Sequence, residues 1–315
     1  MKEERIINYT FIIPHYNTPE LLGRCLRSIP ERNDVQIIVV DDNSKNNDSF
    51  VSLIPELNRR GLEFYITKDG LGAGHARNIG LQKAKGKWLI FSDADDFFSE
   101  NINTILDEYC DAQEDVIFFN TCSCYSDNIE KRFNNRSYDF LFENYEKTGD
   151  RRWFSICYPQ PWGKIIRRKL VVDNNITFQE TMANNDLLFA VKTGTLAKTI
   201  KVVNSLMYWY TYRVGSLSIN KHMEPLKKHL DRIKAYSSCQ QFLDSKNITV
   251  NFPMYWIPIQ SCLPFHWARY KKCMDYLKSN NISTKGFYTR TFIYCINYPL
   301  YKLHIKKNIG LSDLL

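Results

Sequence analysis

Residues 87–98 read KWLIFSDADDFF, a short apolar run that leads directly into three aspartates. The first five residues have the composition of a buried strand, and apolar residues also follow the acidic cluster. Carboxylates crowded in this way repel one another and are costly to remove from water without a positive partner. Asp93 and Asp95 are two residues apart, so in an extended segment they point to the same side. The stretch therefore predicts a cation site at the end of a strand.

The chemistry of the aspartates favours a hard divalent ion. Two carboxylates on one side suit Mg²⁺ or Mn²⁺, which prefer oxygen ligands and commonly share their remaining positions with a diphosphate. Asp96 follows immediately and is a third candidate ligand beside Asp93 and Asp95. The alternative is an acidic helix start, because Asp is favoured in the first turn of a helix. The apolar flanks and the position after a strand favour the metal.

Working outward from this stretch, the chain alternates short apolar runs with amphipathic segments. Expected strands are 9–14, 35–40, 62–66, 87–91 and 115–122; expected helices are 19–29, 72–86 and 100–110. Thr18 is the expected N-cap of the first helix, and Pro19 suits its first position. The run VQIIVV at 35–40 is apolar throughout, as expected of a parallel strand covered on both faces. This alternation predicts an α/β fold with a mostly parallel central sheet flanked by helices.

Ligands of such sheets bind beyond the carboxyl ends of the strands. The tetrapeptide DDNS (41–44) follows one predicted strand as the acidic cluster follows another, so both are expected to face one crevice. Asp42 can accept a hydrogen bond from a ribose hydroxyl or a base N–H, although Asp-Asn-Ser can also simply form a turn.

The glycine-rich segment GLGAGHARNIG (70–80) fails the G-x-G-x-x-G pattern of dinucleotide-binding folds. Its glycines instead allow the backbone to come close to a ligand. Arg77 lies in the first turns of the following helix, where it can face a phosphate or hold the aspartates. The alternative is that Arg77 only forms a salt bridge with the acidic cluster.

Composition is that of a globular protein: the chain has 315 residues, 44% hydrophobic and 24% charged. Its nine cysteines are scattered, odd in number and without a CxxC pair, so neither a disulfide framework nor a zinc cage is expected. We expect free thiols in a reducing cytosol. No secretory segment is expected at the N-terminus, whose apolar run is too short. No membrane span is expected either, because no apolar run approaches the roughly 18–20 residues that one requires.

The net charge of +8 is unevenly distributed, because residues 221–315 hold 15 Lys/Arg against 5 Asp/Glu. This C-terminal part is expected to be helical, and it mixes its basic residues with Trp, Tyr and Phe. The mixture predicts peripheral contact with an anionic membrane surface. The alternatives are an ordinary helical cap with a solvated basic face, or nucleic acid binding. No nucleic acid is expected as a partner, because no recognised reader motif is present.

The motifs IIPHYNTPELLGRCLRSI, VDDNS, GAGHARNIGL and FSDADDFF resemble, in order and spacing, the inverting family 2 glycosyltransferases with the GT-A fold. The match is dense over residues 9–100. It continues more loosely to about residue 216 through PWGKIIRRKLVVDNNITF, NNDLLF and YTYRVGS. The resemblance implies a GT-A domain over residues 1–218, with a nucleotide-sugar half (1–122) and an acceptor half (123–218). A basic, aromatic-rich helical region (219–315) follows it.

The resemblance also implies an activity. The family moves a sugar from a nucleotide-diphosphate donor, most often UDP, with a divalent metal such as Mn²⁺ or Mg²⁺. The implied acceptor is a hydroxyl of a glycan or lipid-linked molecule in bacterial surface polysaccharide synthesis. The implied location is the cytoplasm, peripheral to the inner face of the cell membrane.

Carried over to this sequence, the family pattern implies a general base at Asp186, with Asn185 where Glu is common. The Trp-x-Lys pattern places Trp162 and Lys164 on the acceptor side. His222 joins the three aspartates as a further candidate metal ligand. The donor site is implied to comprise Pro14, Tyr16, Asp42, Arg77, Asp93, Asp95, Arg213 and Ser216.

Each of the later residues has a plainer interpretation. Asp186 can be the N-cap of the following helix, Trp162 can be a core residue, and His222 can be a solvated side chain. A sugar-phosphate nucleotidyltransferase is an alternative function, but it requires a basic, glycine-rich loop that residues 9–20 lack. A non-catalytic sugar- or nucleotide-binding module is the other, and it would not need both the acidic cluster and Asp186.

Overall fold

The computed structural model describes residues 5–45, 54–132, 138–213, 225–249, 259, 262–263, 266–284, 291 and 295. The chain divides into two compact units: Met1–Glu180 with Phe189–Ser216, and Thr181–Leu188 with Leu217–Leu315. The domain boundary expected between residues 218 and 219 stays a prediction. Two candidate site residues, Ser216 and His222, lie outside the described residues.

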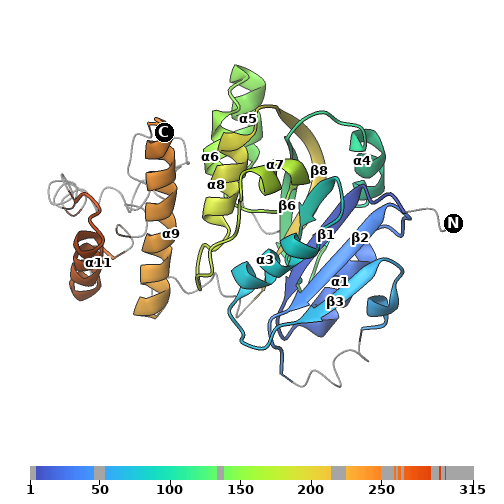
Figure 1. Ribbon diagram of the computed structural model, residues 1–315, viewed down its shortest axis with the longest axis horizontal. Coiled ribbons are helices and arrows are strands. Elements are labelled where there is room, and N and C mark those ends of the chain that lie inside the picture. The colour runs from blue at the N-terminus through green and yellow to red at the C-terminus, as the bar shows by residue number, and fades with distance from the viewer. Residues whose placement is uncertain are drawn as a thin grey trace. The chain divides into compact units, whose positions relative to one another are not determined.

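The first unit is built on an eight-stranded sheet with the order β3-β2-β1-β4-β7-β6-β8-β5. Figure 1 labels β1, β2, β3, β6 and β8 of this sheet. Four of its seven strand pairs are parallel. The predicted α/β fold with a mostly parallel central sheet is therefore confirmed. The strands are β1 (Tyr9–His15), β2 (Val35–Asp41), β3 (Leu62–Ile66), β4 (Trp88–Phe91), β5 (Phe97–Phe98), β6 (Val116–Tyr125), β7 (Lys164–Arg167) and β8 (Ile200–Tyr212).

Helices connect these strands in the order that the sequence pattern predicts for the first hundred residues. They are α1 (Pro19–Ser28), the short 3-10 helix η2 (Pro55–Asn58), α3 (Ala73–Lys83), α4 (Ile102–Tyr109), α5 (Asp139–Thr148), α6 (Arg152–Cys157), α7 (Arg168–Asp173) and α8 (Leu187–Leu196). Helix α3 lies close to β1, because a Cβ built on Gly80 would come within 2.4 Å of the Ile12 side chain. Only glycine permits so close an approach between a helix and a strand.

Thr18 is the N-cap of α1 and Pro19 begins the helix, as expected, although the Thr18 side chain makes no capping hydrogen bond. Residues 139–148 form α5, and residues 174–178 are not in a strand. The sheet also departs from a simple parallel series, because β7 pairs antiparallel with both β4 and β6.

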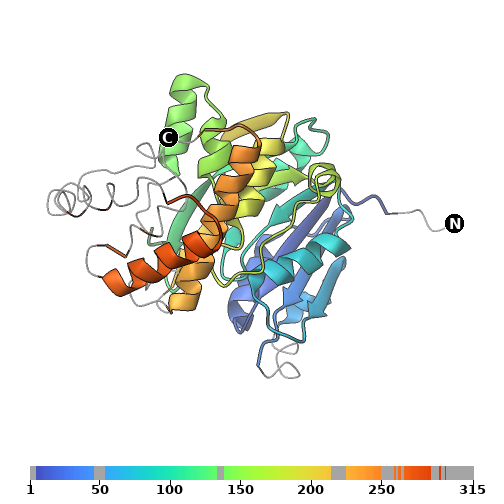
Figure 2. The ribbon, with the colours of Figure 1, turned by 60° about the vertical axis from the view of Figure 1, so that its left-hand side comes forward.

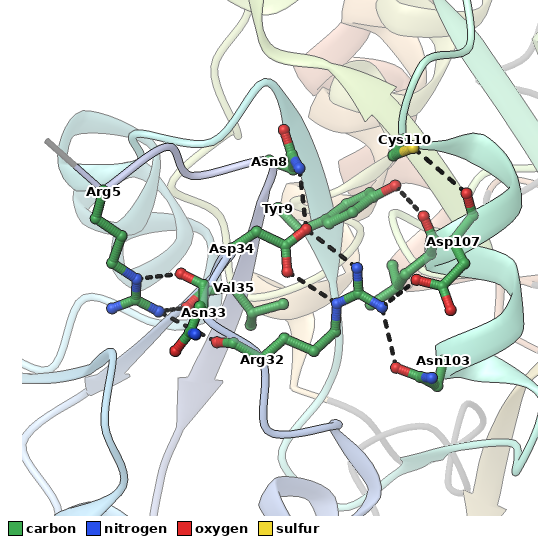
Figure 3. A network of polar contacts seen from close by, with 11 residues as sticks. Arg5, Asn8, Tyr9, Arg32, Asn33, Asp34, Val35, Asn103, Asp107 and Cys110 are labelled. Carbon is green, nitrogen blue, oxygen red and sulfur yellow. Dashed lines mark hydrogen bonds and ion pairs between the residues drawn. The ribbon is translucent and has the colours of Figure 1, made fainter. Parts of the chain in front are cut away.

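A polar network fixes the amino ends of β1 and β2 (Figure 3). Arg32 donates to Asp34 Oδ1 at 2.8 Å and to Asp107 Oδ1 of α4 at 2.5 Å. Asn8 donates to Asp34 Oδ2 at 2.9 Å, and the Tyr9 hydroxyl donates to the Leu106 carbonyl at 2.5 Å. These hydrogen bonds hold β1 and the residues that lead into β2 against α4. The candidate site lies at the opposite, carboxyl ends of these strands.

The second unit contains helices α9 (Leu226–Ser245) and α11 (Trp267–Ser279), drawn in orange shades in Figure 2. Their apolar faces share a small core that includes Ile233, Tyr270, Met274 and Leu277. All nine cysteines of the chain are free, as expected. No helix in the described residues is both long enough and apolar enough to cross a membrane.

Candidate active site

The acidic cluster follows β4 and is a turn. The Asp96 N–H donates to the Asp93 carbonyl at 3.2 Å, so the extended geometry assumed from the spacing of Asp93 and Asp95 is wrong. The two side chains nevertheless stay accessible, with exposed fractions of 36% for Asp93 and 29% for Asp95. Asp96 is buried. The turn therefore leaves the carboxylates of Asp93 and Asp95 partly exposed and buries that of Asp96.

The buried Asp96 is held by β8. The Tyr208 hydroxyl donates to Asp96 Oδ2 at 2.8 Å, and the Thr211 N–H donates to Oδ1 at 2.6 Å. The same hydroxyl accepts the Asp93 N–H at 2.9 Å, so Tyr208 fixes both ends of the turn. Burial, with the charges of Asp95 and Asp93, raises the pKa of Asp96 well above its usual range. Because both oxygens of Asp96 already accept protein hydrogen bonds, the geometry favours Asp93 and Asp95 as metal ligands.

Three arginines surround the turn. Arg77 is buried and donates from Nη2 to Asp93 Oδ1 at 2.5 Å, so it holds the acidic cluster. Arg24 donates to the Asp95 carbonyl at 2.5 Å, which fixes the backbone. Arg213 is 42% exposed, and its Nη2 lies 4.0 Å from Asp95 Oδ2. Burial and the charge of Asp93 raise the pKa of Asp95 more than Arg213 and Arg24 lower it. Asp95 thus carries negative charge that the protein compensates only in part.

The end of β2 forms the neighbouring part of the same sheet edge, because β1 pairs with both β2 and β4. Asp42 is buried and accepts the Gly72 N–H at 2.7 Å and the Thr67 hydroxyl at 3.2 Å. Gly72 has φ of +93°, a conformation that favours glycine. The protein contacts use one direction on each oxygen of Asp42, and a carboxylate offers about four acceptor directions in all.

A second buried pair, His15 and Asp41, lies beside Asp42. His15 Nδ1 lies 2.6 Å from Asp41 Oδ2, and His15 Nε2 accepts the Thr18 N–H at 3.0 Å. Since Nε2 is an acceptor, the proton sits on Nδ1 and is donated to Asp41. Burial raises the pKa of Asp41, but hydrogen bonds from His15 and Ser44 outweigh it and hold the pKa below its usual value. This pair fixes the loop that follows β1.

Two further donor-site candidates flank this loop. Pro14 is buried within β1, opposite Val40 of β2. Tyr16 comes immediately after β1 and is 53% exposed, so its ring is available to a ligand. The described donor-site residues thus lie at or just beyond the carboxyl ends of β1, β2 and β4, with Arg77 on α3 and Arg213 just after β8.

The acceptor candidates Trp162 and Lys164 are buried. Trp162 stacks on Tyr208 and on Tyr210, with ring centroids 5.2 Å apart in each pair. Lys164 Nζ donates to the Tyr158 carbonyl at 2.7 Å and lies over the Phe118 ring. These contacts give both residues a structural role, and Trp162 supports the tyrosine that holds the acidic turn. Their acceptor role stays a prediction.

Asp186 directly precedes α8, and the loop around it is anchored within the second unit. Arg232 of α9 donates to Asn184 Oδ1 at 2.9 Å. The Met182 N–H donates to Asp231 Oδ2 at 3.1 Å. The charge of Asp186 contributes to raising the pKa of the buried Tyr236 to about 12, chiefly an effect of burial. The loop is therefore defined by α9, and the general-base role of Asp186 stays a prediction.

Sequence reasoning missed the residues that build the turn: Tyr208, Thr211 and Arg24. Tyr208 and Thr211 lie more than 100 residues beyond the turn, and no spacing links them to it. The one available signal was the run MYWYTYR, in which a tyrosine and a threonine three residues apart follow a long β-prone stretch. That run predicts a strand, but it does not predict that the strand lies beside the acidic turn.

Replacing Tyr208 with Phe should lower the free energy of unfolding by about 1–3 kcal/mol, because buried Asp96 would lose a donor. Urea unfolding measures the change. Tyr65→Phe is the matched control, since Tyr65 donates to Glu63 at 2.6 Å on the half-buried strand β3. The control should cost less than about 0.5 kcal/mol. Equal losses in the two variants would show that Tyr208 does not have the role assigned to it.

Comparisons with known proteins agree with this architecture. The sequence profile described as Glycosyl transferase family 2 matches residues 10–173, more than half of the chain. Glycosyltransferase GlyA of Streptococcus pneumoniae serotype 4 is 27% identical over 222 residues, which cover 66% of this chain but 31% of GlyA. The chain therefore spans about a third of that relative's length.

Solved structures show the same fold. Staphylococcus aureus TarS residues 1–349, in complex with UDP-GlcNAc, superposes with a TM-score of 0.57 at 19% identity, over 89% of this chain and 75% of that one. The mannosyltransferase PcManGT of Pyrobaculum calidifontis, in complex with GDP-Man and Mn²⁺, gives 0.50 at 15% identity, over 93% and 81%. The predicted GT-A fold is confirmed.

Proposed function

The chain belongs to glycosyl transferase family 2, and from this premise we propose that it is an inverting, metal-dependent glycosyltransferase with a UDP-sugar donor. The observation that carries the proposal is the acidic turn after β4. Two accessible carboxylates are held at the carboxyl edge of the sheet by a third, buried carboxylate that Tyr208 and Thr211 fix in place. The complex of TarS with UDP-GlcNAc supports UDP as the nucleotide.

The donor would lie along the sheet edge. We assign the base and ribose to Pro14, Tyr16 and Asp42, in agreement with the exposed ring of Tyr16. Arg77 acts through Asp93, which it orients. Arg213 is exposed beside the turn and is assigned to the diphosphate.

The residues of the turn fit a hard divalent ion. Asp93 and Asp95 offer exposed carboxylate oxygens, the donors that Mg²⁺ and Mn²⁺ prefer. The Mn²⁺ in the PcManGT complex supports this assignment. Once bound, such an ion supplies positive charge that stabilises the departing diphosphate. Hydrogen bonds with Tyr208, Thr211 and Arg24 hold the turn in place.

Asp186 is proposed as the general base. Inverting transfer is a single displacement, so a carboxylate must take the proton of the acceptor hydroxyl as that oxygen attacks the anomeric carbon. The bond to the nucleoside diphosphate breaks in the same step. The sequence supports the assignment, because Asp186 stands directly before the run LLF (187–189), where the family pattern has its Asp.

The acceptor is proposed to be a hydroxyl of a glycan or a lipid-linked molecule in surface polysaccharide synthesis. Trp162 and Lys164 remain the candidates for its side of the site. Residues 221–315 are proposed to contact anionic membrane from the cytoplasmic face. Their excess of Lys and Arg among aromatic residues supports that contact.

The function is tested with a panel of nucleotide sugars at one enzyme concentration. We expect slow release of UDP from one UDP-sugar in the presence of Mn²⁺, and its loss when EDTA is added, because water can replace the acceptor. Release of pyrophosphate from UTP and a sugar phosphate would instead identify a nucleotidyltransferase. Tight donor binding without any turnover, even with acceptor extracts, would identify a binding module.

A further inference from the structure

Three side chains with soft donor atoms meet inside the second unit. His229 lies on α9, Cys273 lies on α11, and Cys262 lies in the segment between these helices. All three are buried, with exposed fractions of 2%, 0% and 1%. Cys262 Sγ lies 3.1 Å from His229 Nε2, and the three candidate ligand atoms all lie within 4.8 Å of one another. Among the described residues no other group of His, Cys, Asp and Glu converges in this way.

The separations suit a small tetrahedral ion. With Zn–S of about 2.3 Å and Zn–N of about 2.0 Å, the ligand atoms of a tetrahedral site lie roughly 3.5–3.8 Å apart. The observed separations, 3.1 Å for one pair and at most 4.8 Å for all of them, bracket this spacing. Changes of about 1 Å or less in each separation bring the three atoms onto one ion. We propose that His229, Cys262 and Cys273 bind a zinc ion that joins α9 to α11. A water or one further ligand completes the fourth position.

The chemistry of the donors selects the metal. One imidazole and two thiolates are soft or borderline ligands, which favour zinc over Mg²⁺ or Mn²⁺. Zinc binds cysteine as the thiolate, and the ion supplies the positive charge that a thiolate buried in an apolar core requires. The site is therefore chemically distinct from the oxygen-only site proposed at Asp93 and Asp95.

The role that follows is structural. The core that α9 and α11 share is small, and a small core supplies little stability by itself. An ion that binds the folded unit and not the unfolded chain adds its binding free energy to folding. The site is not recognisable in the sequence, because 32 residues lie between His229 and Cys262 and 10 lie between Cys262 and Cys273, and there is no CxxC pair.

The test is the zinc content of the full chain, expressed with zinc and dialysed against EDTA-free buffer. We expect about one zinc per chain by inductively coupled plasma mass spectrometry. Cys262→Ser and Cys273→Ser should each lose it. Cys239→Ser is the matched control, since Cys239 is also fully buried on α9 but lies outside the trio, and it should keep the ion. Asp95→Asn should keep it as well, which separates this site from the active site.

A second measurement uses only the wild-type protein, so it tests the site even if the variants fail to fold. Metal-free wild-type protein is alkylated with and without added zinc, and each cysteine is followed by peptide mass spectrometry. Zinc should protect Cys262 and Cys273, while the half-exposed Cys110 should react equally in both samples. Wild-type protein without zinc, unchanged labelling of the pair, or a Cys262–Cys273 disulfide that excludes the ion would overturn the proposal.

Discussion

Replacing Asp186 with Asn is expected to lower kcat for sugar transfer by roughly 10²–10⁴-fold, the usual contribution of a general base. The amide cannot take the proton of the acceptor hydroxyl, but it preserves the size and hydrogen-bonding reach of the carboxylate. Donor binding does not involve that proton, so KM for the nucleotide sugar should stay within about threefold of the wild-type value. Initial rates at varied donor and acceptor concentrations give both constants.

The control for this variant is Asp244→Asn, which neutralises an exposed carboxylate on α9 in the same unit. Its kinetic constants should match those of the wild type. A pH–rate profile adds a readout that a structural role would not change, because the acidic limb reports the base and should vanish in the Asp186 variant. If Asp186→Asn retains kcat within about threefold, another group takes the proton.

Replacing Asp95 with Asn should abolish metal-dependent nucleotide binding. Asp95 is the accessible carboxylate that its neighbours compensate least, since Arg77 pairs with Asp93 and Arg213 remains 4.0 Å from Asp95. In the wild type, Mn²⁺ should strengthen UDP binding in isothermal titration calorimetry, and EDTA should reverse the effect. In the variant the two titrations should coincide, and kcat/KM should fall by about 10³-fold or more.

The control is Asp111→Asn, an exposed carboxylate that follows α4. It should bind UDP with the same dependence on Mn²⁺ as the wild type. Thermal unfolding of both variants without metal checks that the turn remains folded. An Asp95→Asn protein that still binds UDP more tightly with Mn²⁺ would place the ion elsewhere.

Much of the first unit is predictable because its signals are local. VQIIVV predicts β2 from its composition alone, and KWLIF predicts β4 together with the acidic residues at its end. The pairing of β7 between β4 and β6 is not predictable, because KIIR is a short run whose direction and neighbours depend on the whole sheet.

The details of the site resist prediction for the same reason. The sequence spacing points to Asp93 and Asp95 as candidate metal ligands. It predicts an extended segment, however, where the chain forms a turn. The division of roles among the aspartates depends on Tyr208 and Thr211, which reach Asp96 from a strand more than 100 residues away. Burial is equally hard to predict, because the sequence pattern around Lys164 does not show that its side chain is buried and donates to the Tyr158 carbonyl.

In the proposed mechanism the turn after β4 holds a divalent ion that is shared with the donor diphosphate. Crystals grown with UDP and Mn²⁺ allow the anomalous signal of manganese to be measured. We expect one strong peak within bonding distance of the Asp95 or Asp93 carboxylate and of the diphosphate of a well-ordered UDP. Ordered UDP at the sheet edge with no anomalous peak at the acidic turn would show that the turn does not hold the ion.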